Sequence, residues 1–422
     1  MQLLGRFALA LLLGAITSVC HTAAAEPARL SKADFNERFL LQVNYTEDED
    51  GVQNFKTSRS RVVTFERHGT ALVMLDESAT AEPRQLFAKI PIRAETAHDV
   101  ELDLNAGLDK IYLEEDRTGE DYYGRVDKRD HRAFELFDRH VLSIECNDEL
   151  LVFDQEARKD DGSRVVVHYY LRRYRPAPAF QPFEMTSLEH FGFYETYPLE
   201  RSDHVVLFAM KFDVSKPITF ALSSAIPERY RDAVRDGVLY WNRALGKPLL
   251  QTVDAPDGVE APSASYNVIQ WVESGDYSST SYIQGDPWTG QILHAHVFVL
   301  EETMMDGDLD EQNDHLRYIV AHEIGHALGL RHNFARGKAS TVMGYFRLPQ
   351  ILKIGSGIRT GVPALPFDAA VVQHVYLGAP LDVNMLPAFC TDYQRGCSPF
   401  FLERKETDGM RGDAPQGAPR SH

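Results

Sequence analysis

Short alternating runs of hydrophobic and polar residues fill the first half of the chain. Between about residue 61 and residue 174, runs rich in Val, Phe and Tyr are broken by Gly, Asp and Asn, as in Arg61–Phe65, Ala71–Leu75 and Arg164–Leu171. A repeat of two residues is that of a β-strand with one buried face. The pattern predicts antiparallel strands, and we place a β-rich N-terminal domain at residues 26–180.

A proline-rich segment ends this pattern. Three prolines fall within residues 176–182. Proline disfavours the interior of helices and sheets, because it lacks the amide hydrogen and fixes φ. We therefore expect a linker here, and we place the domain boundary between this segment and about residue 215.

Helical and strand patterns alternate beyond the linker. Hydrophobic residues recur at helical spacing between Pro227 and Gly246, which predicts a helix with one buried face. Residues 266–272 and 291–299 have the pattern of strands, and the turn sequence Asp286–Gly290 precedes the second. These elements predict an α+β protein, with a second domain at residues 200–390.

The two ends of the chain differ from the rest in composition. Residues 1–25 carry one arginine, an apolar run and a small-residue stretch before Glu26, which is the layout of a cleavable signal peptide. We therefore expect export to the periplasm or secretion. Lipid attachment at Cys20 is a less favoured alternative, because Val19 is bulkier than the residue that usually precedes such a site. Residues 403–422 are polar and are expected to form a disordered tail.

An excess of acidic residues limits the partners of the protein. Lys and Arg total 44 against 62 for Asp and Glu, which gives a formal net charge of −18. Such a charge repels nucleic acid and anionic lipid surfaces. After the signal, no stretch reaches the roughly 18–20 apolar residues that a membrane helix needs. We expect a soluble protein with no membrane span and no nucleic-acid partner, and the sequence leaves its oligomeric state open.

Removal of the signal peptide would leave three cysteines, Cys146, Cys390 and Cys397. Cys390 and Cys397 are the natural pair for a short disulfide loop in an oxidising compartment. Cys146 lies in an alternating segment, where a buried and unreactive thiol is the simplest interpretation. Its neighbours give no support to a role as a zinc ligand in a latent form.

The sequence HEIGHALGLRH at residues 322–332 holds the residues with the clearest chemistry. With 3.6 residues per helical turn, His322 and His326 lie one above the other and can bind one ion. Gly329 is expected to end the helix with a positive φ, so that the chain turns and brings His332 to the same ion. Five fixed positions of this kind occur by chance on the order of once in 10⁴ chains of this length. We therefore expect a zinc ion bound by these three histidines.

Glu323 follows the first histidine and is turned out of the ligand row, so it can reach a water on the metal without binding the metal itself. Three neutral imidazoles leave zinc an open position and lower the pKa of a bound water to about 7. Glu323 is thus predicted to act as the general base, which takes the proton of that water and delivers it to the leaving amine. A purely structural zinc site would have no use for a base here.

Together with the segment Ser340–Tyr345, this motif resembles the active-site segment of the metzincin peptidases. The resemblance implies that Met343 forms an apolar floor beneath the histidines, and that Tyr345 binds the zinc or donates a hydrogen bond to the oxyanion. Without the resemblance, Met343 would be a core residue and Tyr345 a packed aromatic. It further implies that Asp368, in a closing helix at residues 368–376, hydrogen-bonds the backbone near the methionine turn.

The resemblance extends to the fold. It implies a metzincin-like catalytic domain, in which a mixed twisted sheet lies above the active-site helix and the helix around Trp241 comes first. The strand that holds His294 and His296 resembles the edge strand along which these enzymes align substrate. The β-rich leader and residues 266–271 are most similar to a group of large exported bacterial zinc-dependent metallopeptidases. Those proteins usually continue well beyond the catalytic domain.

Two weaker clusters leave room for further metal ions. His294 and His296 point to the same side of a strand and suit either a second zinc or a polar strand surface. A group of aspartates could hold Ca²⁺, but it lacks the glycine and terminal glutamate of a calcium loop. An acidic lead-in to the N-terminus of the active-site helix is the simpler interpretation. These aspartates are Asp306, Asp308, Asp310 and Asp314.

These observations predict a zinc-dependent endopeptidase that acts on a protein or peptide substrate. One alternative is a zinc-containing binding protein without turnover, and the presence of Glu323 beside a complete ligand set counts against it. The other alternative is a zinc hydrolase of a non-peptide amide, and the predicted edge strand favours an extended peptide instead. The sequence does not indicate which substrate is cleaved.

Overall fold

The computed structural model describes most of the chain between residues 28 and 390. The described ranges are 28–49, 52–58, 60–78, 84–112, 133–146, 150–185, 192–196, 199–201, 204–263, 265–273, 279–334, 341–381 and residue 390. The predicted signal peptide with Cys20, Cys397 and the predicted tail lie outside the described residues. Cys390 is disulfide-bonded, and its pairing with Cys397 stays a prediction. Among the described residues, no helix is both long enough and apolar enough to cross a membrane.

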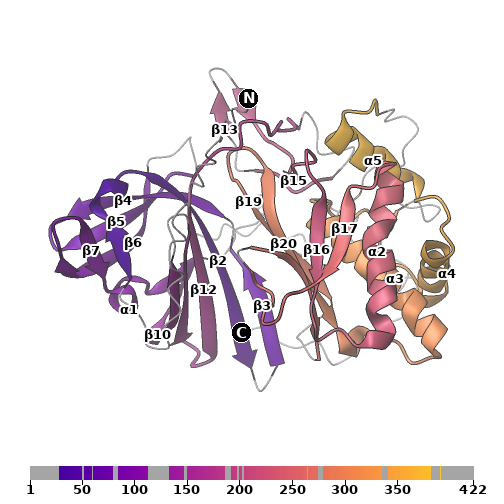
Figure 1. Ribbon diagram of the computed structural model, residues 1–422, viewed down its shortest axis with the longest axis horizontal. Helices are drawn as coiled ribbons and strands as arrows, with labels where there is room; N and C mark the ends of the chain where they lie inside the picture. The colour runs from indigo at the N-terminus through magenta and orange to yellow at the C-terminus, as the bar shows by residue number, and fades with distance from the viewer. Residues whose placement is uncertain are drawn as a thin grey trace, which may run out of the picture.

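The described residues of the first half form one large sheet of ten strands, the N-terminal sheet (Figure 1). Its strands are β1 (Arg29–Ser31), β2 (Arg38–Glu49), β3 (Val52–Thr57), β4 (Arg61–His68), β5 (Ala71–Asp76), β6 (Gln85–Glu95), β7 (Asp99–Leu102), β10 (Phe137–Cys146), β11 (Leu150–Arg158) and β12 (Arg164–Arg173). They follow the order β1-β7-β6-β5-β4-β2-β12-β11-β10, with β3 beside β2, and every pairing is antiparallel. Strands β4, β5 and β12 lie where the alternating runs predicted strands.

Short elements accompany this sheet. They are η1 (Lys32–Asp34), α1 (Leu104–Gly107), the pair β8 (Lys110–Tyr112) and β9 (Ala133–Glu135), and the pair β13 (Leu199–Arg201) and β14 (His204–Val206). No helix or strand covers residues 175–183, in the segment predicted to be a linker.

A second, mixed sheet of six strands occupies the described part of the C-terminal half, and we call it the C-terminal sheet. Its strands are β15 (Lys211–Phe212), β16 (Ile218–Leu222), β17 (Leu250–Asp254), β18 (Asn267–Val272), β19 (Thr280–Gly285) and β20 (Gln291–Leu300). The order β15-β20-β18-β16-β17 is parallel throughout, and β19 pairs antiparallel with β20. The mixed sheet agrees with the predicted α+β class.

Helices cover one face of the C-terminal sheet, while the N-terminal sheet lies on its other side (Figure 1). The helices are α2 (Glu228–Leu245), α3 (Leu309–Ala327), α4 (Leu348–Arg359) and α5 (Pro366–Leu377), and η2 (Glu301–Thr303) follows β20. The predicted apolar face of α2 is buried, and Gly246 ends this helix with a φ of 68°. Buried hydrophobic side chains form separate clusters under the two sheets. The domain boundaries themselves stay predictions.

Hydrogen bonds join the N-terminal sheet to the β19–β20 hairpin and the loop before β18. They run from Tyr170 OH to Pro262 O (3.0 Å), from Gly285 N to Ser60 Oγ (3.2 Å), from Trp288 Nε1 to Ser78 O (3.1 Å) and from Tyr174 OH to Asp286 Oδ2 (3.1 Å). The N-terminal sheet therefore supports the strand that lies nearest the histidine cluster.

Candidate metal centre

Helix α3 carries the first two histidines of the cluster. Its N-terminus is capped by Asp308, whose side chain accepts a hydrogen bond from Glu311 N at 2.9 Å. This cap satisfies a backbone donor and places negative charge where the helix dipole favours it. Val320 and Ile324 are fully buried on the core side of the helix. His322 and His326, one turn apart, are both buried as well.

Gly329 ends helix α3 for two separate physical reasons. Its φ is 96°, and Gly329 N donates to His326 O (2.8 Å) while Leu330 N donates to Gly325 O (3.0 Å). These two bonds form a Schellman motif, which needs a left-handed residue at this position. In addition, a Cβ on Gly329 would lie 2.1 Å from Met210 O. The chain therefore turns sharply here and carries His332 back over the helix end.

The three histidine side chains converge on one point. Their Nε2 atoms lie 3.2 Å apart for His322 and His326, 3.1 Å for His326 and His332, and 3.2 Å for His322 and His332. Three nitrogens bound to one tetrahedral zinc at roughly 2.0–2.1 Å would stand about 3.3–3.4 Å apart. The donor set and its spacing thus fit a zinc ion. Within the described residues, this is the one group of three or more side chains that could hold a metal ion.

The other ring nitrogen of each helical histidine is bound to the backbone. His322 Nδ1 lies 2.7 Å from Val342 O, and His326 Nδ1 lies 2.8 Å from Leu330 O. A carbonyl oxygen only accepts, so each Nδ1 carries the proton and each Nε2 offers its lone pair to the centre. Burial, with a smaller effect of His332, lowers the pKa of His322 to about 3. The pKa of His326 is lowered in the same direction by burial. Both rings are thus neutral at pH 7, as metal binding requires.

Met343 lies beneath the cluster and is fully buried. A Cβ on Gly325 would lie 2.2 Å from Met343 Sδ and 2.7 Å from the Trp241 ring. The thioether therefore packs directly on the helix backbone between the two ligand positions. Asn333 N donates to Met343 O at 2.8 Å, which ties the segment after His332 to the same turn.

Asp368, at the start of α5, binds the turn that holds His322. Its fully buried carboxylate accepts hydrogen bonds from Val342 N (2.9 Å), from the Thr341 hydroxyl (2.5 Å) and from the Tyr240 hydroxyl (2.5 Å). Because Val342 O in turn accepts from His322, the carboxylate positions this ligand through the backbone of one residue. Burial raises the pKa of Asp368 to about 6, although the three hydrogen bonds act in the opposite direction.

Glu323 is buried beside the histidines, in the wall of a cavity of about 280 Å³ that the three rings also line. Burial raises the pKa of its carboxyl well above the usual value, and the Ser281 hydroxyl next to it opposes this rise. The carboxyl is therefore shielded from water, which favours uptake of a proton.

Tyr345 lies at the rim of the same cavity and is 48% exposed, so it is not a packed core aromatic. Its ring centroid is 5.8 Å from that of His322 and 4.7 Å from that of His332. This position puts the tyrosine beside the metal-binding rings with part of its surface open to solvent.

The remaining cavity wall comes from residues that the sequence did not single out. They are Tyr194, Ser279, Thr280, Ser281, Thr303, Tyr318 and Ile319. Tyr194 belongs to a segment that is distant in the sequence, and a hydrogen bond from its N to Gly329 O at 2.7 Å holds it at the cavity. The serines and Thr280 lie in or beside β19, whose alternating sequence TSYIQG is the one local signal that could have identified it as a strand.

The edge strand beside this cavity is β19, so the interpretation of the strand with His294 and His296 as the edge was wrong. That strand is β20, which is paired with β18 on one side and β19 on the other. The local pattern of β20 does not show which strands pair with it, because the pairing is set by distant segments. His296 is buried, and its Nε2 lies 2.9 Å from Ser263 N and from Ser263 O. It thus contacts the backbone of a loop.

The acidic residues before α3 have separate surroundings. Asp306, Asp308 and Asp310 are exposed, and Asp308 caps the helix. Asp314, in contrast, is buried and accepts hydrogen bonds from Arg317 (2.9 Å) and Arg359 (3.0 and 3.1 Å). The aspartates form a helix cap and an ion-pair network, and Asp314 is not a solvated residue of the acidic lead-in.

Two histidines one turn apart, a third after a glycine turn and a methionine turn beneath them define a metal centre of the zincin type. Residues 305–348 match a protein family described as Met-zincin. The match contains the three histidines, Glu323, Met343 and Tyr345, and supports a metzincin-clan zinc metallopeptidase. It does not reach the N-terminal sheet. No curated protein matches the chain.

Replacement of a histidine in the cluster should abolish metal binding. We expect one zinc per chain in the wild type and none in His326→Ala, because two imidazoles cannot replace the three-nitrogen set. Metal content is measured by mass spectrometry after dialysis. His98→Ala, which changes an exposed histidine, should keep the zinc. Stoichiometric zinc in His326→Ala would show that the ligand assignment is wrong.

The raised pKa of Asp368 predicts a pH dependence of folding. The folded protein keeps a proton on this carboxyl up to about pH 6, whereas the unfolded chain loses it near pH 4, so the free energy of unfolding falls as pH rises between these values. In Asp368→Asn, this decrease of up to about 3 kcal/mol should disappear. Urea unfolding of the metal-free protein from pH 4 to pH 7 measures the difference. Parallel pH profiles of the two proteins would contradict the assignment.

Proposed function

We propose that the protein is a zinc-dependent endopeptidase with Glu323 as its general base. The observation that carries this proposal is the position of Glu323. A buried carboxyl with a raised pKa shares one cavity wall with three histidine nitrogens that fit a zinc ion. Zinc, when bound, supplies a Lewis acid that polarises the scissile carbonyl and acidifies the attacking water.

Glu323 takes the proton from the attacking water and passes it to the leaving amine. Burial of the carboxyl raises its pKa, which favours uptake of a proton from the water. Ser281, on β19, lines the same cavity, and its hydroxyl opposes the rise in the pKa of the Glu323 carboxyl. The Met-zincin match to the segment that contains Glu323 supports this role.

Strand β19 is suited to hold an extended peptide in the cavity. It pairs with β20 and with no other strand in the part of the chain that the structure describes, so its second edge is open to main-chain pairing. Ser279, Thr280 and Ser281 place this edge beside the histidines. Peptides commonly bind by adding a strand to such an edge. This arrangement favours a peptide over a non-peptide amide.

Tyr345 is proposed to donate a hydrogen bond to the oxyanion that develops on the scissile carbonyl. Its ring rests against His322 and His332 at the open rim of the cavity, where the carbonyl of a bound peptide would lie. A donor fixed at this point stabilises the transition state more than the substrate.

Glu323→Gln should keep the zinc and lose turnover. The amide preserves the shape of the side chain but cannot take a proton, so hydrolysis of a diverse peptide library should fall by about 10²–10⁴-fold. Glu311→Gln, in the exposed first turn of the same helix, is the matched control and should cleave normally. Cleavage at the wild-type rate by Glu323→Gln would exclude Glu323 as the base. Absence of cleavage by wild type loaded with zinc would favour a binding protein without turnover.

Tyr345→Phe tests the oxyanion role separately, because the phenylalanine ring can still pack on the histidines. We expect kcat to fall by about 10²-fold, with little change in KM and with zinc content unchanged. Zinc loss in this variant would indicate a metal ligand instead. Unchanged kcat would indicate that the tyrosine only packs at the rim.

A further inference from the structure

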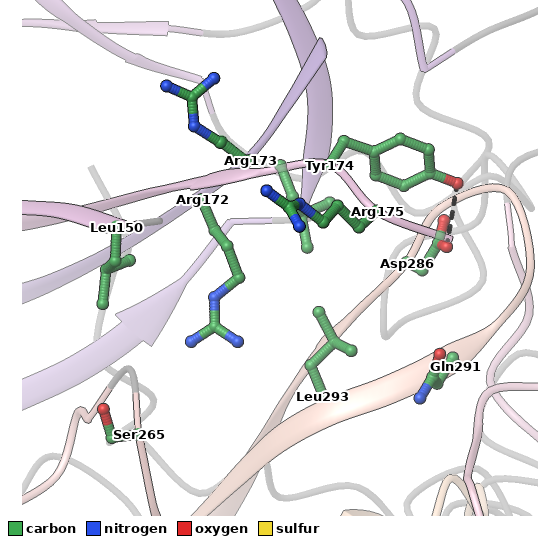
Figure 2. A pocket seen from close by; sticks show the side chains of 10 residues that line it. Leu150, Arg172, Arg173, Tyr174, Arg175, Ser265, Asp286, Gln291 and Leu293 are labelled. Carbon is green, nitrogen blue, oxygen red and sulfur yellow. Dashed lines mark hydrogen bonds between the residues drawn. The ribbon is translucent and has the colours of Figure 1, made fainter. Parts of the chain in front are cut away.

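A second cavity, of about 500 Å³, lies between the N-terminal and C-terminal sheets (Figure 2). Leu40, Leu150 and Arg172 contribute one wall from strands β2, β11 and β12, and Gln291 and Leu293 contribute the opposite wall from β20. The cavity lined by Glu323 and the three histidines is called the zinc cavity below. It shares no lining residue with this second cavity. The second cavity is therefore a separate site, on the face of the C-terminal sheet away from the helices.

The lining of this cavity is basic, although the chain as a whole is acidic. The sequence Arg172-Arg173-Tyr174-Arg175 ends β12 and runs along the cavity. Arg173 points away and binds Asp34 through both of its terminal nitrogens, at 2.5 and 2.8 Å. In Figure 2, the Arg172 side chain extends toward the side where Leu293 lies, and the Arg175 side chain extends along the cavity toward Arg172. Their guanidinium groups give this wall its positive charge.

Asp286 is the acidic residue among the described residues of this lining, and it is already engaged. Its carboxylate accepts hydrogen bonds from the Tyr174 hydroxyl (3.1 Å) and from Trp288 N (2.8 Å). Tyr174 also packs edge-on against the Trp288 ring, with centroids 5.2 Å apart. These contacts fix the rim of the cavity and turn the carboxylate toward its own donors.

The cavity continues into a narrow inner end with unsatisfied polar atoms. This extension of about 20 Å³ shares Leu40, Leu150, Arg172 and Leu293 with the larger cavity, and Gln284 and His294 close it. Gln284 Nε2 and His294 Nε2 are buried and have no hydrogen-bond partner among the described residues. Burial, with smaller effects of His296 and of the Arg172 charge, lowers the pKa of His294 to about 3. The ring is thus neutral and can donate or accept a hydrogen bond.

We propose that this cavity binds the C-terminal end of a short peptide, with the carboxylate held by Arg172 and Arg175. Guanidinium groups pair with carboxylates through two parallel hydrogen bonds. The three leucines suit an apolar side chain, and the side chains of Gln291 and Ser265 suit peptide amide groups. A volume of about 500 Å³ is far larger than an inorganic anion needs and lies within the usual range for small-molecule sites.

Binding is measured by calorimetry on the full-length protein with acetyl-Ala-Leu-Leu as the free acid. The His326→Ala variant is used alongside wild type, because it can neither hydrolyse the peptide nor bind its carboxylate through zinc. We expect one peptide per chain in both proteins, and a rise in melting temperature because the ligand joins two sheets. The C-terminal amide of the same peptide should bind roughly 10- to 100-fold more weakly.

Arginine variants locate the site. Arg172→Gln and Arg175→Gln should each weaken binding of the acid by roughly 10-fold or more. Arg164→Gln, at the opposite end of the same strand, is the matched control and should bind normally. Melting curves show whether each variant is folded. If Arg172→Gln does not fold, Arg175→Gln tests the proposal by itself, because Arg175 is at an exposed position.

Several results would overturn the proposal. Equal binding of the acid and the amide would exclude carboxylate recognition. Octanoate or inorganic phosphate binding as tightly as the peptide would show a fatty-acid site or a simple anion site. If the folded wild type did not bind the acid, the arginines would serve only in the contact between the two sheets. Loss of binding in His326→Ala alone would place the peptide at the zinc cavity.

Discussion

Three histidine nitrogens within 3.2 Å of one another are the constraint on which the rest of the C-terminal half depends. Neutral rings would not gather this closely without support, because each lone pair points at the others. The support comes from the opposite ring nitrogens, which are bound to the carbonyls of Val342 and Leu330. Those carbonyls are placed by the methionine turn and by the turn that follows α3, so backbone groups of non-ligand residues orient two of the three histidines.

The sequence predicted best what local periodicity and turn chemistry determine. The spacing of His322 and His326 follows from one helical turn, and the positive φ of Gly329 follows from the need to leave the helix. Helix α2 and strands β18 and β20 were likewise predicted from their hydrophobic patterns. The fully buried network around Asp368 was anticipated through family resemblance, and its partner Tyr240 was not, because it comes from 128 residues earlier in the chain.

What the sequence could not predict is set by contacts between distant segments. Tyr194 reaches the zinc cavity by pairing with the residue after the active-site helix, and β19 is an edge strand only because of the order of strands in the sheet. The cavity between the sheets is likewise formed by segments that are far apart in the sequence. Arg172 and Arg173 are adjacent in sequence, yet strand alternation sends one toward the cavity and the other toward Asp34.

The hydrogen bond from Val342 N to Asp368 spans 26 residues and has a consequence for the order of assembly. All three histidines precede this carboxylate in the chain, so they leave the ribosome while the turn that orients His322 still lacks its acceptor. A nascent chain therefore carries a complete set of ligands before it has a preformed site. We therefore expect full metal affinity to develop only after α5 docks and Asp368 accepts the hydrogen bond from Val342 N.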